Sequence, residues 1–181
     1  MNQEQLLYQE LKAQLKTSTG TQRTAWARYI VEHNINLKAL TPLLQEEEKT
    51  AMRMAWLLSD VGLCDKEKLF DVLPCLFSIR TTCVAPGFEQ QFAKYWRIAG
   101  IPEEDKGLAI DYMFQWLVAP EESTHIKTVS LEVLYQVTKE YPELKNELQL
   151  CLEQQPEDID VSLKKAIKKV QALSQKNRAE P

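Results

Sequence analysis

The sequence predicts an all-α protein, and three observations support that prediction. No segment of the 181-residue chain alternates apolar and polar residues as a half-buried strand would. Apolar residues instead recur at helical spacing, as in the series Leu163, Ile167 and Val170. The chain has only five glycines, and four of them stand where the helical periodicity stops. About ten helices joined by short turns are therefore expected.

The helix boundaries follow from these patterns. In chain order the expected helices cover residues 2–16, 22–33, 37–45, 48–62, 66–79, 88–99, 103–118, 124–140, 143–154 and 159–174. Pro42, Pro102 and Pro142 each stand next to a hydroxyl or acidic residue, as first-turn prolines do. Pro74 would lie inside the helix at 66–79, where it predicts a kink or a break, because proline lacks the amide hydrogen that a helix interior needs.

The helices differ in how their apolar residues are distributed. The helix at 2–16 carries leucines on one stripe and is expected to cap the fold. The helices at 48–62, 103–118 and 124–140 are apolar on two faces or nearly all round, so they need neighbours on both sides. The helix at 159–174 has one apolar stripe with lysines opposite, which is typical of a surface helix.

A stack of antiparallel helix pairs supplies neighbours on both sides of each helix. Trp56 and Trp96 are 40 residues apart, and Trp96 and Leu134 are 38 apart, close to the ~40–47-residue period of two-helix repeats. The sequence therefore predicts a right-handed α-α superhelix of four to five helix pairs. It is expected to form a single helical-repeat domain over residues 1–181, with a short disordered tail from about residue 175.

Two segments carry a family resemblance. The stretch from Trp56 to Phe77 and the turn Lys139-Glu-Tyr-Pro-Glu-Leu144 between two apolar helices resemble HEAT and armadillo-like repeat proteins, over roughly residues 24–174. The resemblance implies a HEAT-like solenoid that binds partners on a concave face lined by the second helix of each pair. The C-terminal third also resembles a small bacterial group of HEAT-like proteins, some of which carry an adenylosuccinate lyase label. The Met-Pro-Lys-Asn loop of those lyases is absent from this sequence.

Charge and composition bear on partners and compartment. The net charge of −4 and pI of about 5.4 disfavour a protein built to grip phosphate backbones. The lysine-rich end of the chain is interpreted as a solvated helix face. No signal-peptide h-region and no apolar run of membrane-spanning length is present. The four cysteines form no C-x-x-C pair, so reduced cytoplasm is the expected location and no membrane association is predicted.

The usual catalytic and metal-binding motifs are missing. His33 and His125 have no further ligand at metal spacing, so no metal or other cofactor is predicted. Neither a G-x-S-x-G elbow nor a glycine-rich phosphate loop occurs. Cys83, in a loop, could act as a nucleophile only if the fold brought a base such as His125 close to it. The sequence leans against an enzyme.

Acidic and aromatic residues in apolar helices keep an alternative open. Three acids, Asp60, Asp71 and Asp111, lie within such helices, and three basic residues, Arg53, Arg80 and Arg97, lie in or beside them. A buried charge needs a partner, and the HEAT resemblance implies that Asp and Arg tie neighbouring repeats together. The four tryptophans, Trp26, Trp56, Trp96 and Trp116, are expected in the core, although tryptophan can also stack on bases.

These observations lead to one main functional hypothesis and two alternatives. The main hypothesis is a non-enzymatic adaptor or scaffold that binds a protein or peptide on its concave face. The first alternative is a HEAT-like enzyme or binder of nucleic acid, of the alkylated-base DNA glycosylase type. The second is a structural, self-associating domain. The longest stretch without helical period, residues 80–88, is the candidate interaction loop, and its candidate contact residues are Arg80, Cys83, Val84 and Phe88.

Overall fold

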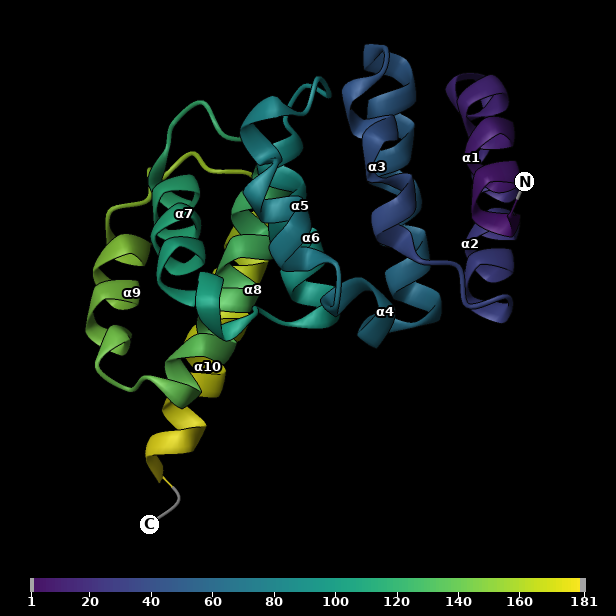
Figure 1. The fold of residues 1–181 in the computed structure, drawn as a ribbon. Helices are drawn as coiled ribbons and strands as arrows, with labels where there is room; N and C mark the ends of the chain where they lie inside the picture. The colour runs from purple at the N-terminus through teal and green to yellow at the C-terminus, as the bar shows by residue number, and fades with distance from the viewer. Residues whose placement is uncertain (1, 180–181) are drawn as a thin grey trace. The chain divides into compact units, whose positions relative to one another are not determined.

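A computed structural model describes the backbone of residues 2–179 and the side chains of residues 2–173 (Figure 1). Over that part of the chain there are ten α-helices, four short 3₁₀ helices and no strand, which confirms the all-α prediction. The elements are α1 (Gln3–Gln14), η1 (Leu15–Thr17), α2 (Gly20–Glu32), η2 (Leu37–Gln45), α3 (Glu48–Cys64), α4 (Lys66–Phe70), α5 (Leu73–Ser78), η3 (Arg80–Thr82), α6 (Phe88–Ala99), η4 (Glu103–Asp105), α7 (Lys106–Val118), α8 (Thr124–Glu140), α9 (Leu144–Glu153) and α10 (Val161–Ala179).

The chain divides into two compact units, Met1–Asp105 and Lys106–Pro181, called here the N-terminal and C-terminal units. Repeats that contact only their neighbours divide readily into such units. The single helical-repeat domain over residues 1–181 therefore stays a prediction. The tail expected from about residue 175 falls on side chains outside the described residues, while the backbone of α10 continues to Ala179.

Helices in the N-terminal unit pack in two layers. In the second layer α3 lies between α2 and α6, and in the first layer α1 packs against η2 (Figure 1). The α1–η2 contact skips η1 and α2, and the α3–α6 contact skips α4, α5 and η3, as stacked helix pairs require. The second-layer helices of this unit are therefore α2, α3 and α6.

The C-terminal unit repeats the pattern on a smaller scale. Helix α8 packs against α7 and α10, and α7 also touches α9 (Figure 1). Contacts α7–α9 and α8–α10 again skip one helix, so α7 and α9 form one layer and α8 and α10 the other.

Local sequence accounts for the helix starts. Asn2 caps α1 and Thr19 caps α2, and in each a glutamine three residues on (Gln5 or Gln22) bonds back to the cap backbone. Gly87, before α6, has φ +67°, a left-handed conformation that a residue with a Cβ rarely adopts.

Prolines explain the two departures from the predicted helices. The segment 37–45 is a 3₁₀ helix and not an α-helix, and Pro42 lies inside it instead of in the first turn. The predicted helix at 66–79 is broken after Phe70, and Pro74 lies in the first turn of α5. The break is the outcome predicted for Pro74, because proline cannot donate the hydrogen bond of a helix interior.

An aromatic cluster forms the centre of the N-terminal core. Phe92 is in edge-to-face or tilted contact with Phe77, Phe88, Tyr95 and Trp96, at ring-centroid distances of 5.2 to 5.5 Å. The hydroxyl of the fully buried Tyr95 donates a 2.7 Å hydrogen bond to the carbonyl oxygen of Ala55, which ties α6 to α3.

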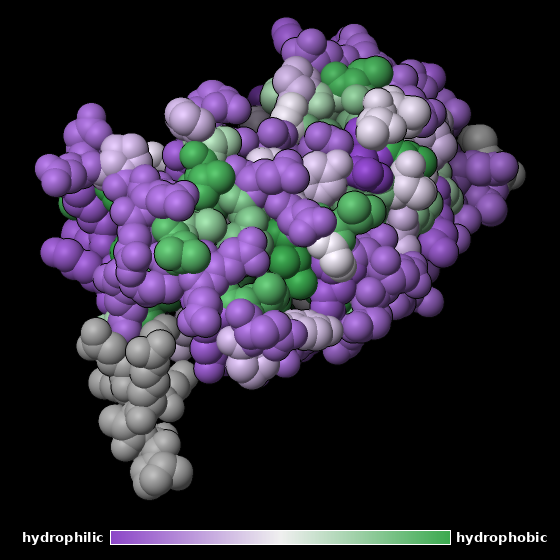
Figure 2. Space-filling view, turned by 90° about the vertical axis from the view of Figure 1, so that its left-hand side faces the viewer, coloured by the Kyte–Doolittle hydropathy of each residue, from purple (hydrophilic) through white to green (hydrophobic). Residues whose placement is uncertain are grey.

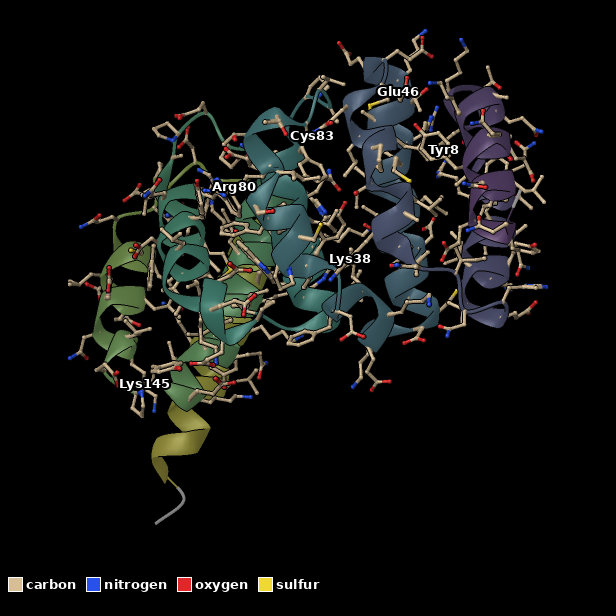
Figure 3. All side chains as sticks on the ribbon, viewed as in Figure 1. Tyr8, Lys38, Glu46, Arg80, Cys83 and Lys145 are labelled. Atoms are coloured by element: carbon tan, nitrogen blue, oxygen red, sulfur yellow. The ribbon has the colours of Figure 1, made fainter. Side chains whose placement is uncertain are left out.

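Hydrogen bonds to Glu46 hold α1 against the rest of the N-terminal unit. Tyr8 and Lys12 on α1 both donate to Oε1 of Glu46, at 3.0 and 2.6 Å (Figure 3). These bonds lower the pKa of Glu46, with the Lys12 bond the larger cause and the Tyr8 bond the next. The contact joins α1 to the segment between η2 and α3.

Replacing Glu46 with glutamine is expected to lower the urea midpoint of unfolding at pH 7 and to have little effect near pH 3. A carboxylate whose pKa is depressed in the folded state contributes stability above its unfolded pKa of about 4.3, and that contribution is lost as the pH falls through the folded pKa. Chemical denaturation at both pH values measures this, with the exposed Glu121→Gln as the matched control. Equal effects of Glu46→Gln at both pH values would contradict the assignment.

Candidate interaction surface

A group of charged and aromatic side chains lies on the second-layer helices of the N-terminal unit. It comprises Arg23 of α2, Arg53, Trp56 and Asp60 of α3, and Lys94 of α6, and is called here the Arg–Trp cluster. All five residues are intermediate in exposure, neither buried in the core nor fully solvated.

Helical spacing places the middle of the cluster. Arg53, Trp56 and Asp60 follow one another at intervals of three and four residues, which puts them on one face of α3. Because α3 contacts both α2 and α6, Arg23 and Lys94 reach this face from either side.

Arg23 and Arg53 share one indole ring. Their Cζ atoms lie 5.2 and 4.6 Å from the ring centroid of Trp56, within the range of cation–π contacts. Arg23 also pairs with Asp60, with Nε 3.6 Å from Oδ2, and its Nη1 donates to the carbonyl oxygen of Ser18 at 3.3 Å. Two cations therefore share one ring, and only Arg23 of the two also pairs with the carboxylate.

The ionisation of the cluster reflects partial burial. Burial raises the pKa of Asp60, and the positive charges of Arg23 and Lys94 lower it only in part. Burial also lowers the pKa of Arg23; the charge of Asp60 opposes this and that of Arg53 adds to it. Partial burial is the largest cause of both shifts, so these charges are less well solvated than those of free side chains.

Arg53 is the arginine of the cluster whose hydrogen-bond donors lack acceptors among the described residues. Its Nε is buried without an acceptor, and none of the described residues accepts a hydrogen bond from this guanidinium or forms an ion pair with it. Its one contact of this kind is the face of Trp56. Since a partly buried charge is costly without a partner, this position suits an external anion.

The three acids singled out from the sequence differ in their exposure and in their ion pairing. Asp60 forms the α2–α3 ion pair that the HEAT resemblance implied. Asp71 and Asp111 are exposed, which corrects the expectation that they lie inside apolar helices as buried charges. Asp71 stands in the break between α4 and α5, and Asp111 on the outer side of α7.

The four tryptophans also differ in burial. Trp26, Trp96 and Trp116 are buried, with exposed fractions of 9, 2 and 7%, as expected for core residues. Trp56 is half-buried and packs against Arg23 and Arg53. Arg23 and Lys94 were not singled out from the sequence, since neither lies in a motif. Only the packing of α2 and α6 on α3 brings Arg23 to Trp56 and the charge of Lys94 near Asp60.

The loop at 80–88 contributes differently from expectation (Figure 3). Phe88 is only 3% exposed and packs in the aromatic core, so it has no surface to offer a partner. Val84 is 44% exposed, although its backbone N–H is held by the carbonyl oxygen of Leu44. Arg80 lies over the ring of Phe77 and pairs with Glu89, with Nε 3.7 Å from Oε1.

Cys83 does not have the surroundings of an activated nucleophile. Burial raises the pKa of its thiol, the opposite of what a catalytic thiolate needs, and the hydrogen bond from the backbone of Ala85 offsets this only in part. His125, the base considered for it, belongs to the C-terminal unit.

Other features of the described residues hold no further site. Their His, Cys, Asp and Glu side chains nowhere gather in threes that could hold a metal ion. The helices of the described chain include none with the length and apolar character needed to cross a membrane. An open polar pocket beside α4 is lined by Asn34, Asn36, Leu37, Lys38, Lys68, Asp71 and Val72. Its amides are engaged, since Asn34 accepts from Lys68 and Asn36 caps the backbone of Lys38.

Comparison with known proteins agrees with this architecture. A family model described as HEAT repeat domain matches residues 9–173, nearly the whole chain. No curated protein and no solved structure matches the sequence.

Proposed function

This chain belongs to the HEAT repeat domain family, and from that premise we propose that it is a non-enzymatic adaptor or scaffold that binds a protein or peptide. Stacked helix pairs present the second helices of successive repeats as one extended surface. In the N-terminal unit that surface is formed by α2, α3 and α6, the helices that carry the Arg–Trp cluster.

The observation that carries the proposal is the half-buried Trp56 in contact with two arginines. Tryptophan and arginine are the side chains that most often dominate binding energy at protein interfaces. The other three tryptophans are buried in the core, so Trp56 is the one whose ring can meet a partner.

Replacing Trp56 with alanine is expected to weaken partner binding about 30-fold or more, the effect of removing a central interface tryptophan. The experiment is affinity capture from native lysate, with and without nuclease, read by mass spectrometry. Wild type should retain a dominant protein after nuclease treatment, and Trp56→Ala should lose it. Val84→Asp is the control for the loop at 80–88: loss of the partner with this variant, and not with Trp56→Ala, would move the binding surface to that loop.

One observation favours the nucleic-acid alternative. Nucleic-acid binding uses cations beside aromatic rings, and an enzyme of the glycosylase type would also need an acid there; the cluster holds Asp60 one helical turn from Trp56. Against it, Asp60 is already paired with Arg23, and the chain carries a net charge of −4. Capture that disappears with nuclease, together with loss of activity in Asp60→Asn, would support this alternative.

Self-association is the other alternative. Figure 2 shows apolar residues gathered on one face and bordered by hydrophilic ones. In the C-terminal unit Leu108, Leu150 and Val161 are 54, 57 and 65% exposed. Large exposed apolar groups of this kind can pair with a second copy. Recovery of the bait alone, with a mass above that of a monomer in sedimentation, would support this alternative.

A further inference from the structure

We infer that the Arg–Trp cluster binds a carboxylate of an acidic peptide segment, with Arg53 as the principal ligand. The inference rests on the proposed function and specifies the chemistry of the partner. Three features of the described residues carry it: the charge balance of the cluster, the unfilled hydrogen-bonding capacity of Arg53, and the apolar contacts available on the same face of α3.

The charge balance calls for an anion. The cluster contains three cations, Arg23, Arg53 and Lys94, and the single carboxylate of Asp60. Asp60 is committed to Arg23, at 3.6 Å. A carboxylate supplied by a partner could therefore pair with Arg53, which has no acidic partner among the described residues.

Arg53 has the geometry to receive that carboxylate. A guanidinium offers five N–H donors in a planar fork that matches the two oxygens of a carboxylate. No described residue accepts a hydrogen bond from these donors, and the cation–π contact with Trp56, with Cζ 4.6 Å from the ring centroid, holds the guanidinium beside the ring. Because Nε is buried, the two Nη groups are the donors that would meet the carboxylate. A side chain held in place before binding loses less conformational entropy when the ligand arrives.

The surroundings favour a peptide over a nucleic acid. Trp56 offers its ring, and Leu63, two helical turns further along the same face of α3, is 69% exposed. An acidic peptide can use both the carboxylate contact and these apolar contacts. Nucleic-acid binding draws most of its affinity from many phosphate contacts, whereas three cations on an acidic chain provide few.

Peptide selection tests the inference directly. Random short peptides displayed on phage are selected on the wild-type protein, and the recovered sequences are synthesised with a fluorescein label. Each is made a second time with Asp and Glu replaced by Asn and Gln. Fluorescence anisotropy then measures the affinity of both versions for the wild type and for Arg53→Gln.

The recovered peptides should contain Asp or Glu, and the amide versions should bind at least about 10-fold more weakly, the loss of one charge-assisted hydrogen-bonded pair. Arg53→Gln should lose the same factor for the acidic peptide and little for its amide version. Arg53→Lys, which keeps the charge but not the fork, should fall between them. The control Arg28→Gln removes the same charge from an exposed position of α2 and should bind like the wild type. The melting temperatures of the four proteins should differ by no more than the loss of one cation–π contact, the one between Arg53 and Trp56.

Three outcomes would overturn the inference. Selected peptides without acidic residues, bound equally by wild type and Arg53→Gln, would leave the proposed function intact and remove the carboxylate site. Failure to select any peptide would remove the acidic-peptide site, whereas the proposed function would fail only if affinity capture also recovered no partner. A fluorescein-labelled DNA duplex that binds more tightly than every selected peptide, and is lost in Arg53→Gln, would assign the cluster to nucleic acid.

Discussion

Replacing Tyr95 with alanine is expected to lower the free energy of unfolding by about 3–5 kcal/mol, the range for truncating a buried aromatic side chain. Tyr95 is fully buried, lies edge-to-face against Phe92 and Phe88, and donates to the carbonyl oxygen of Ala55. Its removal leaves a cavity between α3 and α6, the helices that present most of the Arg–Trp cluster. Urea denaturation followed by circular dichroism measures the loss.

Tyr95→Phe is the matched control. It keeps the ring and removes only the 2.7 Å hydrogen bond to Ala55, so it should cost about 0.5–1.5 kcal/mol. A phenylalanine variant as unstable as the alanine variant would show that the hydrogen bond, and not ring packing, holds α6 against α3.

Gly62→Ala is expected to destabilise the protein by about 1–2 kcal/mol, although alanine is the better helix former. A Cβ at position 62 would lie 2.3 Å from Cδ2 of Leu69 and 3.1 Å from both Cβ of Leu69 and Cγ2 of Ile98. Leu69 is fully buried, so it has little room to move away. Overpacking of about 1–3 kcal/mol then outweighs a gain in helix propensity of at most about 1 kcal/mol. The shift in urea midpoint measures the net effect.

Gly107→Ala supplies the opposite case within the same chain. Gly107 lies in α7 with no atom within 4 Å of a Cβ built there. The substitution should therefore raise the free energy of unfolding, by up to about 1 kcal/mol through helix propensity alone. Destabilisation by both substitutions would mean that the close approach of α3 to α4 and α6 is not the reason Gly62 is glycine.

Most of the secondary structure could be predicted because helix formation depends on local patterns. Apolar periodicity and capping residues placed all but one of the helices within a few residues of their observed bounds, and the break at Pro74 followed from the missing amide hydrogen of proline. The segment 37–45 was the exception. Its apolar spacing suits an α-helix, but Pro42 lies in its interior, where the chain adopts the tighter 3₁₀ form.

Trp56 and Trp96 show where local patterns stop being informative. Their 40-residue spacing gives them equivalent places in α3 and α6, helices that begin at Glu48 and Phe88. Trp96 nevertheless packs against Phe77 and Phe92 in the core, whereas Trp56 lies half-exposed against two arginines. Burial depends on which neighbouring helix faces a side chain, and spacing along one helix does not contain that information.

Local patterns in the sequence predicted the all-α class, the helical-repeat character and the helix order, and the HEAT resemblance implied that an Asp–Arg pair joins neighbouring repeats. The pairing of Asp60 with Arg23, the burial of Phe88 and the lack of an acid partner for Arg53 among the described residues all follow from how the helices pack. The difference arises because the two kinds of interaction act over different distances along the chain. Helix propensity, capping and proline effects act over a few residues of chain. The Arg–Trp cluster instead depends on the packing of α2, α3 and α6 side by side, which brings together residues as far apart in the sequence as Arg23 and Lys94, 71 positions from each other.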